Sequence, residues 1–287
     1  MTHTDNAPLR LRSVLYMPGA NERALEKARD LPADALILDL EDAVAPAAKQ
    51  EARERVCALA AEGVYGVRTV AIRANGIGTE WHEADIAAAC AAGPDAILVP
   101  KVSSAQEVLD LEFSLSAYGA PEHTKLWAML ETPQAALDAY QICSASERLT
   151  VLVMGTNDLL KELYAVSVPG RGPLLTGLSL CLLGARAAGK MIVDGVYNDV
   201  KDPEGFGAEC LQGKQLGFDG KTLIHPGQVD ICNTVFSPSA AEIEHANKVI
   251  AAFEEAEAAG SGVVTVDGRM IENLHVESAR RVLSLAG

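Results

Sequence analysis

Two acidic residues, Glu131 and Asp158, each follow an apolar run of the sequence. Leu126–Leu130 leads into Glu131, and Leu149–Met154 leads through a Gly-Thr-Asn segment into Asp158. Both runs are typical of buried strands that end at turn or helix-start residues. Two carboxylates with no His or Cys beside them form an oxygen-only ligand set, which suits Mg²⁺ or Mn²⁺ better than Zn²⁺. The alternative is that both are helix N-cap or first-turn acids, favoured there by the helix dipole.

A second acidic group, formed by Asp39, Glu41 and Asp42, closes another apolar run. Three carboxylates within four residues repel one another unless a cation compensates them. Arg73, at the end of the next run, or a divalent metal could supply that charge. A plain Arg–carboxylate pair with a structural role would explain the same residues. Arg73 could also hold a substrate carboxylate in bidentate geometry, which makes it a candidate binding residue.

The segment from Tyr16 to Lys27 combines a strand end, a Pro-Gly turn and the opening of a helix. Free backbone N–H groups at the helix start, with Arg23 and Lys27 on adjacent faces, would suit a phosphate. A solvated helix start explains the same residues without a ligand.

The elements that must position these residues alternate between strands and helices. Ala-, Glu- and Leu-rich segments at helical spacing separate eight β-rich runs, which predicts βαβ units and a parallel sheet. Eight units over about 210 residues is the count of an α/β fold of the (β/α)₈ TIM barrel type, with an open doubly wound sheet as the alternative. In a barrel the strand ends, including Lys101, Asp194 and His225, would converge on one mouth. The eight runs are Ser13–Pro18, Ala35–Asp42, Val70–Asn75, Ala96–Val102, Lys125–Thr132, Leu149–Asp158, Met191–Tyr197 and Gly220–His225.

A C-terminal extension follows the predicted barrel. It begins with a helix over 238–259 and a Gly-Ser-Gly linker over 260–262. Asp267-Gly268, flanked by short apolar runs, predicts a β-hairpin, and an amphipathic segment over 272–285 ends the chain. A hairpin and helix on a hinge would be unstable alone, so we expect them to pack on a neighbouring subunit. We therefore place the barrel at 8–236 and the extension at 237–287.

Composition narrows the classes of partner. The 287 residues are 49% hydrophobic and carry a net charge of −15, which argues against nucleic acid and anionic membranes as partners. No run of about 18 apolar residues occurs and the N-terminus lacks an apolar signal core, so we expect a soluble, cytoplasmic protein. The six dispersed cysteines are expected to be buried small hydrophobes rather than metal ligands or disulfides.

Seven motifs occur in order along nearly the whole chain. They are Ser13-Val-Leu-Tyr-Met-Pro-Gly, Leu38-Asp-Leu-Glu-Asp-Ala-Val, Ile72-Arg-Ala-Asn, Val99-Pro-Lys, Met129-Leu-Glu-Thr-Pro, Gly155-Thr-Asn-Asp-Leu and Leu223-Ile-His-Pro. Together they resemble the citrate lyase β-subunit-like proteins of the HpcH/HpaI aldolase superfamily, which include the malyl-CoA and citramalyl-CoA lyases.

The resemblance implies a metal-dependent barrel enzyme that makes or breaks a C–C bond between an acyl-CoA and a 2-oxo acid. It also implies a homo-oligomer, a trimer or hexamer, with active sites at subunit interfaces. Mg²⁺ is the implied cofactor, with Mn²⁺ possible, and coenzyme A is part of the substrate. By resemblance, Glu131 and Asp158 bind the metal, and Arg73 binds the oxo-acid carboxylate and the developing oxyanion.

The remaining candidate residues follow from the same motifs. Asp267 matches an aspartate that related lyases send into a neighbouring active site, although it also fits the first position of a type I′ turn. In many relatives a basic residue stands where this chain has Asn21, so the contact to the CoA phosphate is expected to shift to Arg23. His225 fits either a contact near the thioester or a structural role at the barrel rim. The candidates are catalytic Asp267, Arg73, Glu41 and Asp42, and substrate- or CoA-binding Tyr16, Asn21, Arg23, Lys27, Asn157 and His225.

Several functions fit these residues. The leading hypothesis is a C–C lyase that cleaves malyl-CoA, citramalyl-CoA or a related β-hydroxyacyl-CoA by a retro-Claisen step. A malyl-CoA thioesterase could use the same metal and Arg73, with water attacking the thioester instead. A lyase subunit that requires an acyl-carrier-protein partner would also fit the motifs, and so would a non-catalytic binding protein.

Overall fold

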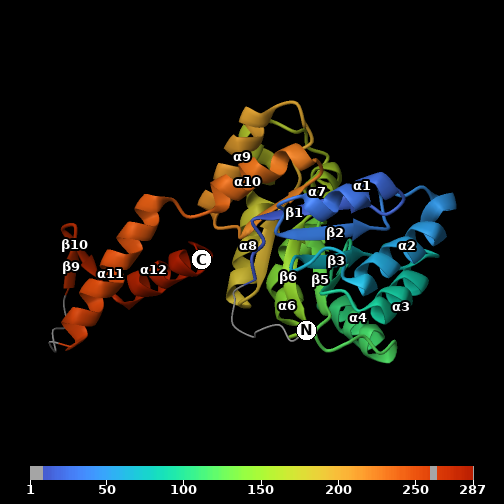
Figure 1. Cartoon of the computed structure of the whole chain (residues 1–287), viewed down its shortest axis with the longest axis horizontal. Coiled ribbons are helices and arrows are strands. Elements are labelled where there is room, and N and C mark those ends of the chain that lie inside the picture. The colour runs from blue at the N-terminus through green and yellow to red at the C-terminus, as the bar shows by residue number, and fades with distance from the viewer. Residues whose placement is uncertain (1–8, 259–263, 287) are drawn as a thin grey trace. The chain divides into compact units, whose positions relative to one another are not determined.

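The computed structural model of the chain describes residues 9–258 and 264–286. Within residues 11–234, eight parallel strands close into a barrel in chain order, with β8 pairing back onto β1 (Figure 1). The predicted (β/α)₈ barrel is confirmed. Its strands are β1 (Ser13–Pro18), β2 (Ala35–Asp39), β3 (Thr69–Arg73), β4 (Ala96–Val99), β5 (Lys125–Leu130), β6 (Leu149–Met154), β7 (Met191–Asp194) and β8 (Gly220–Leu223).

Helices connect consecutive strands and surround the barrel. They are α1 (Glu22–Lys27), α2 (Lys49–Glu62), α3 (His82–Ala92), α4 (Ala105–Ala117), α5 (Pro133–Leu137), α6 (Ala139–Ser144), α7 (Thr156–Glu162), α8 (Leu175–Ala187), α9 (Pro203–Leu216) and α10 (Val229–Phe236). Short 3₁₀ turns complete the connections at η1 (Ala28–Asp30), η2 (Pro46–Ala48), η3 (Pro169–Leu174) and η4 (Pro226–Gln228).

Most of the strands end earlier than the apolar runs suggested. The run expected to continue to Asp158 ends at Met154, and Asp158 lies in the first turn of α7 instead. After β5, the Thr132 side chain accepts a hydrogen bond from the Ala135 N–H and caps α5. Thr132 and Asp158 therefore lie at helix starts rather than in strand continuations.

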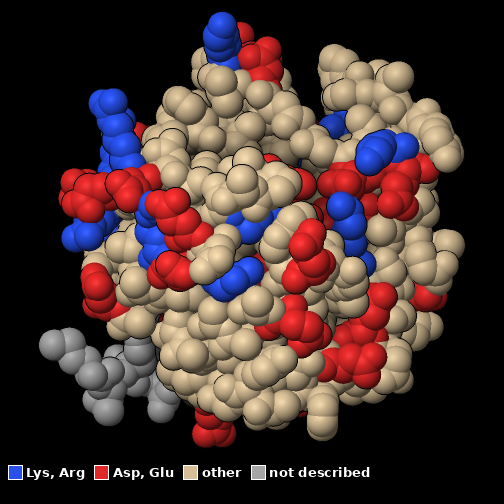
Figure 2. Space-filling view, turned by 90° about the vertical axis from the view of Figure 1, so that its right-hand side faces the viewer, with Lys and Arg blue, Asp and Glu red and all other residues tan. Residues whose placement is uncertain are grey.

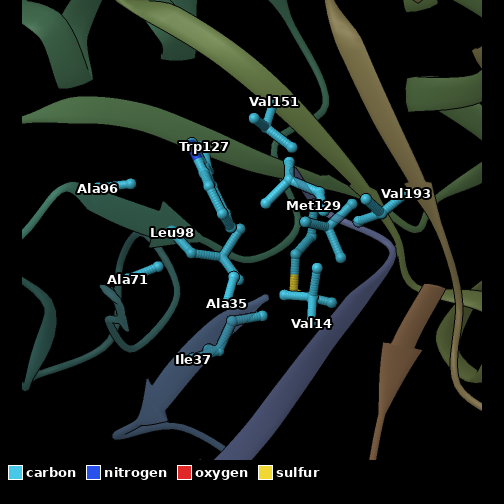
Figure 3. Packing of buried hydrophobic residues seen from close by; sticks show 12 residues of the cluster. Val14, Ala35, Ile37, Ala71, Ala96, Leu98, Trp127, Met129, Val151 and Val193 are labelled. Atoms are coloured by element: carbon cyan, nitrogen blue, oxygen red, sulfur yellow. The ribbon is translucent and has the colours of Figure 1, made fainter. Parts of the chain in front are cut away.

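Alternate residues of the strands fill the barrel interior. Side chains from β1, β2, β3, β4, β6 and β7 pack around Trp127 and Met129 of β5 (Figure 3). Because successive strand residues face opposite sides, one parity of each strand points inward and the other packs under the helices. The inward set is Leu11, Val14, Ala35, Ile37, Ala71, Ala96, Leu98, Trp127, Met129, Val151, Val153 and Val193.

The C-terminal residues form a second compact unit. It contains α11 (Ala240–Ala258), β9 (Val264–Val266), β10 (Arg269–Ile271) and α12 (Asn273–Ala286), so the predicted helix, hairpin and helix are present. Asp267 and Gly268 have φ values of 50° and 77°, as a type I′ turn requires. A small apolar cluster that includes Val249, Ile271 and Val276 joins the helices to the hairpin. The predicted linker over 260–262 lies outside the described residues.

The surface is rich in acid, as the net charge of −15 requires. Acidic side chains form several patches on the face drawn in Figure 2. All six cysteines carry free thiols, and five of them are buried. Among the described residues, no helix has both the length and the apolar character needed to cross a membrane.

Candidate active site

A cavity of about 370 Å³ lies where the C-terminal ends of the barrel strands meet. This is the end at which α/β barrels place their active sites. The cavity brings together residues that are far apart in the sequence, from Tyr16 in β1 to Ile224 directly after β8. Of the predicted site residues, Tyr16, Asp42, Arg73, Glu131, Asn157 and Asp158 line it.

Strand parity explains why four of the polar side chains reach this cavity. Trp127 and Met129 point into the barrel, so Glu131, two residues further along, continues the same face. The same step of two leads from Ile37 to Asp39 and from Ala71 to Arg73. Tyr16 follows Val14 in the same way. These residues form a polar layer on top of the apolar interior.

Glu131 is buried, with only 2% of its surface exposed. Its Oε1 atom accepts a hydrogen bond of 2.7 Å from the backbone N–H of Lys101. Burial raises its pKa to about 7, and the negative charges of Asp158 and Glu41 add to that effect. A carboxylate with a pKa raised in this way is stabilised by any cation that enters the cavity.

Arg73 is held by two acidic residues from the preceding strand end. Its Nε and Nη2 atoms each donate to an Asp39 oxygen at 2.7 Å, and Nη1 lies 2.7 Å from Glu41 Oε2. The guanidinium also stacks over the Tyr16 ring, 4.7 Å from its centre. The Arg–carboxylate pair is therefore present, with Asp39 in the bidentate position, and the Glu41 contact is the one that a substrate carboxylate could replace.

Burial raises the pKa of Glu41, and the nearby carboxylates of Asp42 and Asp39 raise it further against the opposing effect of Arg73. Its side chain is 12% exposed and lies within 3.9 Å of the Lys101 ammonium. Glu41 thus combines a raised pKa with a position beside the candidate anion-binding arginine, which are properties expected of a general base.

Glu131 and Asp158, the two predicted metal ligands, both line the cavity. Gly155 adjoins Glu131 so closely that a Cβ atom there would overlap the Glu131 side chain. Among residues 9–258 and 264–286 there is no group of three or more His, Cys, Asp or Glu able to hold a metal. This donor set fits Mg²⁺, which binds through one or two carboxylates and takes its remaining ligands from substrate and water.

The sequence pattern of the HpcH/HpaI aldolase/citrate lyase family matches residues 12–226. The chain belongs to this family. A second pattern, described as a C–C bond lyase of the TIM-barrel fold, matches residues 173–287.

Relatives in the HpcH/HpaI family carry two kinds of name. The chain is 55% identical to a (3S)-malyl-CoA thioesterase from Cereibacter sphaeroides over 96% of this chain and 94% of that protein. It is 38% identical to the citrate lyase subunit beta of Escherichia coli over 96% and 93%. The structure of CitE from Mycobacterium tuberculosis with magnesium, acetoacetate and coenzyme A is similar, with a TM-score of 0.76, 28% identity and coverage of 96% and 97%.

Beside the main cavity of this HpcH/HpaI family member lies a second, more open hollow that shares Pro18 and Ala43 with it. Asn21 lines this hollow and also caps α1 by accepting from the Ala24 N–H at 3.0 Å. Arg23 and Lys27 are exposed on α1, and neither lines the cavity or the hollow. The basic residue that does line the hollow is Arg55, which pairs with Glu22 and Glu51.

Three further candidates have local partners. Asn157 exchanges two hydrogen bonds with Asn198, at 3.2 and 2.8 Å. The exposed His225 accepts from the Gly227 N–H through Nδ1 and caps η4, which supports its structural role at the rim. Asp267 belongs to the C-terminal unit, where its 65% exposed side chain lies 3.4 Å from His245 Nδ1.

Asp194 was expected at the mouth, and that expectation is wrong. Its neighbour Val193 takes the inward position, so Asp194 points out of the barrel interior. There it pairs with Arg171 at 2.7 Å and with the fully buried Lys221 at 3.1 Å. The last residue of a strand can have either parity, and polarity alone did not show which.

Two lysines lie near the site, one of them expected at the barrel mouth and the other not predicted. Lys101, expected there with the other strand ends, contacts Asp158 and Glu41. The buried Lys49 ammonium, which was not predicted, donates to the backbone carbonyls of Leu40 and Glu41, both at 2.8 Å, and so fixes the acidic segment that follows β2. The sequence carries no signal for Lys49 because it lies within a helical segment.

Proposed function

We propose that this chain is a Mg²⁺-dependent enzyme that hydrolyses the thioester of a malyl-CoA-type substrate. The observation that carries the proposal is the 55% identity to the (3S)-malyl-CoA thioesterase, which extends over 96% of this chain. The cavity supports it, since it is lined by the two proposed metal-binding carboxylates and by Arg73, which suit a substrate with a hydroxyl group and carboxylates. The substrate would thus be a short β-hydroxyacyl-CoA with a free carboxylate.

The residues divide the work of hydrolysis between them. Glu131 and Asp158 would hold Mg²⁺, which when bound supplies positive charge to the oxygens of the acyl group. Arg73 would bind the free carboxylate of the substrate in exchange for Glu41. Glu41, released from that contact, would accept the proton of the water that attacks the thioester carbonyl. The C–S bond then breaks, and the sulfur leaves as the CoA thiol after taking up a proton.

A C–C lyase is the second candidate function, favoured by the 38% identity to the citrate lyase subunit beta. In that reaction a base removes the proton of the β-hydroxyl group, the bond between the α- and β-carbons breaks, and the acyl-CoA enolate takes up a proton. The same metal and Arg73 would stabilise the developing oxyanion, and each preorganised donor contributes roughly 3–4 kcal/mol in comparable sites. In a citrate lyase-type complex the thioester would be carried by an acyl carrier protein instead of CoA.

Product analysis separates the two reactions. The purified protein is incubated with Mg²⁺ and malyl-CoA, and the products are resolved by chromatography. Hydrolysis gives free CoA and malate, whereas cleavage of the C–C bond gives acetyl-CoA and glyoxylate. Acetyl-CoA without free CoA would overturn the thioesterase proposal and establish the lyase. Glu131→Gln should abolish metal-dependent turnover while leaving the circular dichroism spectrum intact.

We also propose that Asp267 transfers protons in the active site of a neighbouring subunit of a homo-oligomer. Its position on an exposed hairpin turn, outside the barrel unit, supports this role. The test mixes two variants, Asp267→Ala and Arg73→Ala, each inactive alone. Mixed oligomers would contain some sites that combine an intact Arg73 with an intact Asp267, so activity should return. No recovery after confirmed subunit exchange would contradict supply in trans.

A further inference from the structure

The loop after β4 places Lys101 in a backbone conformation that L-residues rarely adopt. Its φ value is +56°, in the left-handed region. This conformation is strained for a residue with a side chain and persists only where the surrounding contacts hold it in place. In this conformation its N–H points at Glu131 Oε1, 2.7 Å away, and its side chain returns toward the acidic residues of the cavity.

The ammonium group of Lys101 lies between two carboxylates from different strand ends. It is 3.6 Å from Asp158 Oδ1 and 3.9 Å from Glu41 Oε1. Nearly half of the side chain, 47%, is exposed, so the ammonium can move away without opening the barrel. Arg73, by contrast, is 10% exposed and is fixed by its bidentate pair with Asp39.

The charges at the mouth are unbalanced without a further cation. Five carboxylates face three cations, Arg73, Lys101 and Lys49, and the Lys49 ammonium is held by the backbone carbonyls of Leu40 and Glu41. The carboxylates are Asp39, Glu41, Asp42, Glu131 and Asp158. Arg73 is paired with Asp39 and Glu41, whereas the Lys101 ammonium contacts Asp158 and its backbone N–H contacts Glu131.

We propose that Lys101 is the internal counter-ion of the metal site. Its backbone N–H orients Glu131. In the metal-free enzyme its ammonium holds Asp158, and it competes with Mg²⁺ for the negative charge of that carboxylate. Lys101 is therefore a positioning residue whose side chain opposes metal binding and whose backbone supports it. The inference rests on the proposed role of Glu131 and Asp158 as metal ligands.

The two functions of Lys101 can be separated by substitution. Lys101→Met removes the charge and keeps the bulk, while Lys101→Gly removes the side chain, keeps the N–H and suits a positive φ. Lys101→Arg keeps the charge. Lys125→Met is the matched control, because it removes the same charge at the first residue of β5, at the opposite end of the barrel from Glu131.

Binding of Mg²⁺ alone is measured by isothermal titration calorimetry, and thermal stability is measured in EDTA. Lys101→Met and Lys101→Gly should bind Mg²⁺ roughly five-fold more tightly than the wild type, since the partly exposed ion pair with Asp158 no longer opposes the metal. Lys101→Met should also melt roughly 2 °C lower in EDTA. Lys101→Arg and Lys125→Met should bind Mg²⁺ as the wild type does.

The outcomes distinguish this inference from the proposed function. Unchanged or weaker Mg²⁺ binding by both Lys101→Met and Lys101→Gly, with a wild type that binds the ion, would overturn the counter-ion role alone. If Glu131→Gln binds Mg²⁺ as tightly as the wild type, the metal assignment itself fails, and the inference fails with it. The identity of the reaction products affects neither result.

Discussion

Replacing Gly155 with alanine tests the metal site without touching a charged group. Gly155 joins β6 to α7, and its N–H donates to the Leu130 carbonyl at 3.1 Å. A Cβ atom at this position would overlap Glu131 Cβ and Oε2 and lie 2.9 Å from Cδ. Because the position of Glu131 Cβ is set by the backbone, rotation of the side chain cannot relieve this overlap. The ends of β5 and β6 must move apart, and Glu131 moves with them.

The size of the effect follows from these contacts. Carbon atoms that do not share a bond approach to about 3.5 Å, so Glu131 must shift by roughly 1 Å or more. Overpacking of this kind costs about 1–3 kcal/mol of stability. A displacement of about 1 Å in a positioned group lowers turnover about 100-fold. We expect Mg²⁺ affinity to fall at least about tenfold, because Glu131 is one of only two proposed protein ligands.

The matched control is Gly172→Ala, since a Cβ atom at Gly172 meets no neighbouring atom within 4 Å. Both variants are compared with the wild type by Mg²⁺ calorimetry, by steady-state turnover of malyl-CoA and by urea unfolding. The reasoning predicts that only Gly155→Ala loses metal affinity and turnover. If Gly155→Ala bound Mg²⁺ and turned over substrate within twofold of the wild type, the close approach of Glu131 would have no functional meaning.

Two further predictions concern charge. Burial raises the pKa of Glu131 to about 7, above its value in the unfolded chain. The metal-free fold therefore loses stability as the pH rises from about 4.5 to about 7, and bound Mg²⁺ would restore that stability. The apparent affinity for Mg²⁺ should therefore be about tenfold weaker at pH 6 than at pH 8 by calorimetry, and equal affinities would contradict the linkage. Burial opposes ionisation of Asp194, but Lys221 and Arg171 outweigh it and lower the pKa of Asp194. The ion pairs of Asp194 therefore stabilise the fold above the pKa of an unfolded aspartate, and this stabilisation is lost as the pH falls through the lowered pKa. Asp194→Asn should cost about 3–5 kcal/mol in urea unfolding at pH 7, whereas a loss below about 1 kcal/mol would show that the buried cations find other partners.

The fold could be predicted from the sequence because the apolar runs are long and regularly spaced. Glu131 and Arg73 could be predicted as well, since each comes at the end of such a run and shares the parity of inward-facing residues. Asp194 also ends an apolar run, but it has the opposite parity and points away from the barrel interior. Parity, rather than position at the end of a run, therefore decides which side chains enter the cavity. A short strand such as β7, with three apolar residues before its aspartate, gives no alternation from which parity can be read.

The sequence places Lys101 at the barrel mouth but does not show which residues its side chain contacts. Lys101 is about half exposed, and an exposed lysine after a strand usually has no specific partner. Its role depends on the positive φ at that position and on the neighbouring loops that carry Glu41 and Asp158. The same holds for Arg55, which lines the second hollow because α2 packs beside the turn that follows β1.

The charge at the barrel mouth implies an order of binding. A malyl-CoA-type substrate is an anion, and the protein itself carries a net charge of −15. Entering the metal-free cavity, its carboxylate would meet Glu41 and the pair formed by Glu131 and Asp158, with Arg73 already occupied. Bound Mg²⁺ neutralises that pair, so the substrate carboxylate then has to displace only Glu41 from Arg73. Metal should therefore bind first, and the affinity for substrate should rise with occupancy of the metal site rather than independently of it.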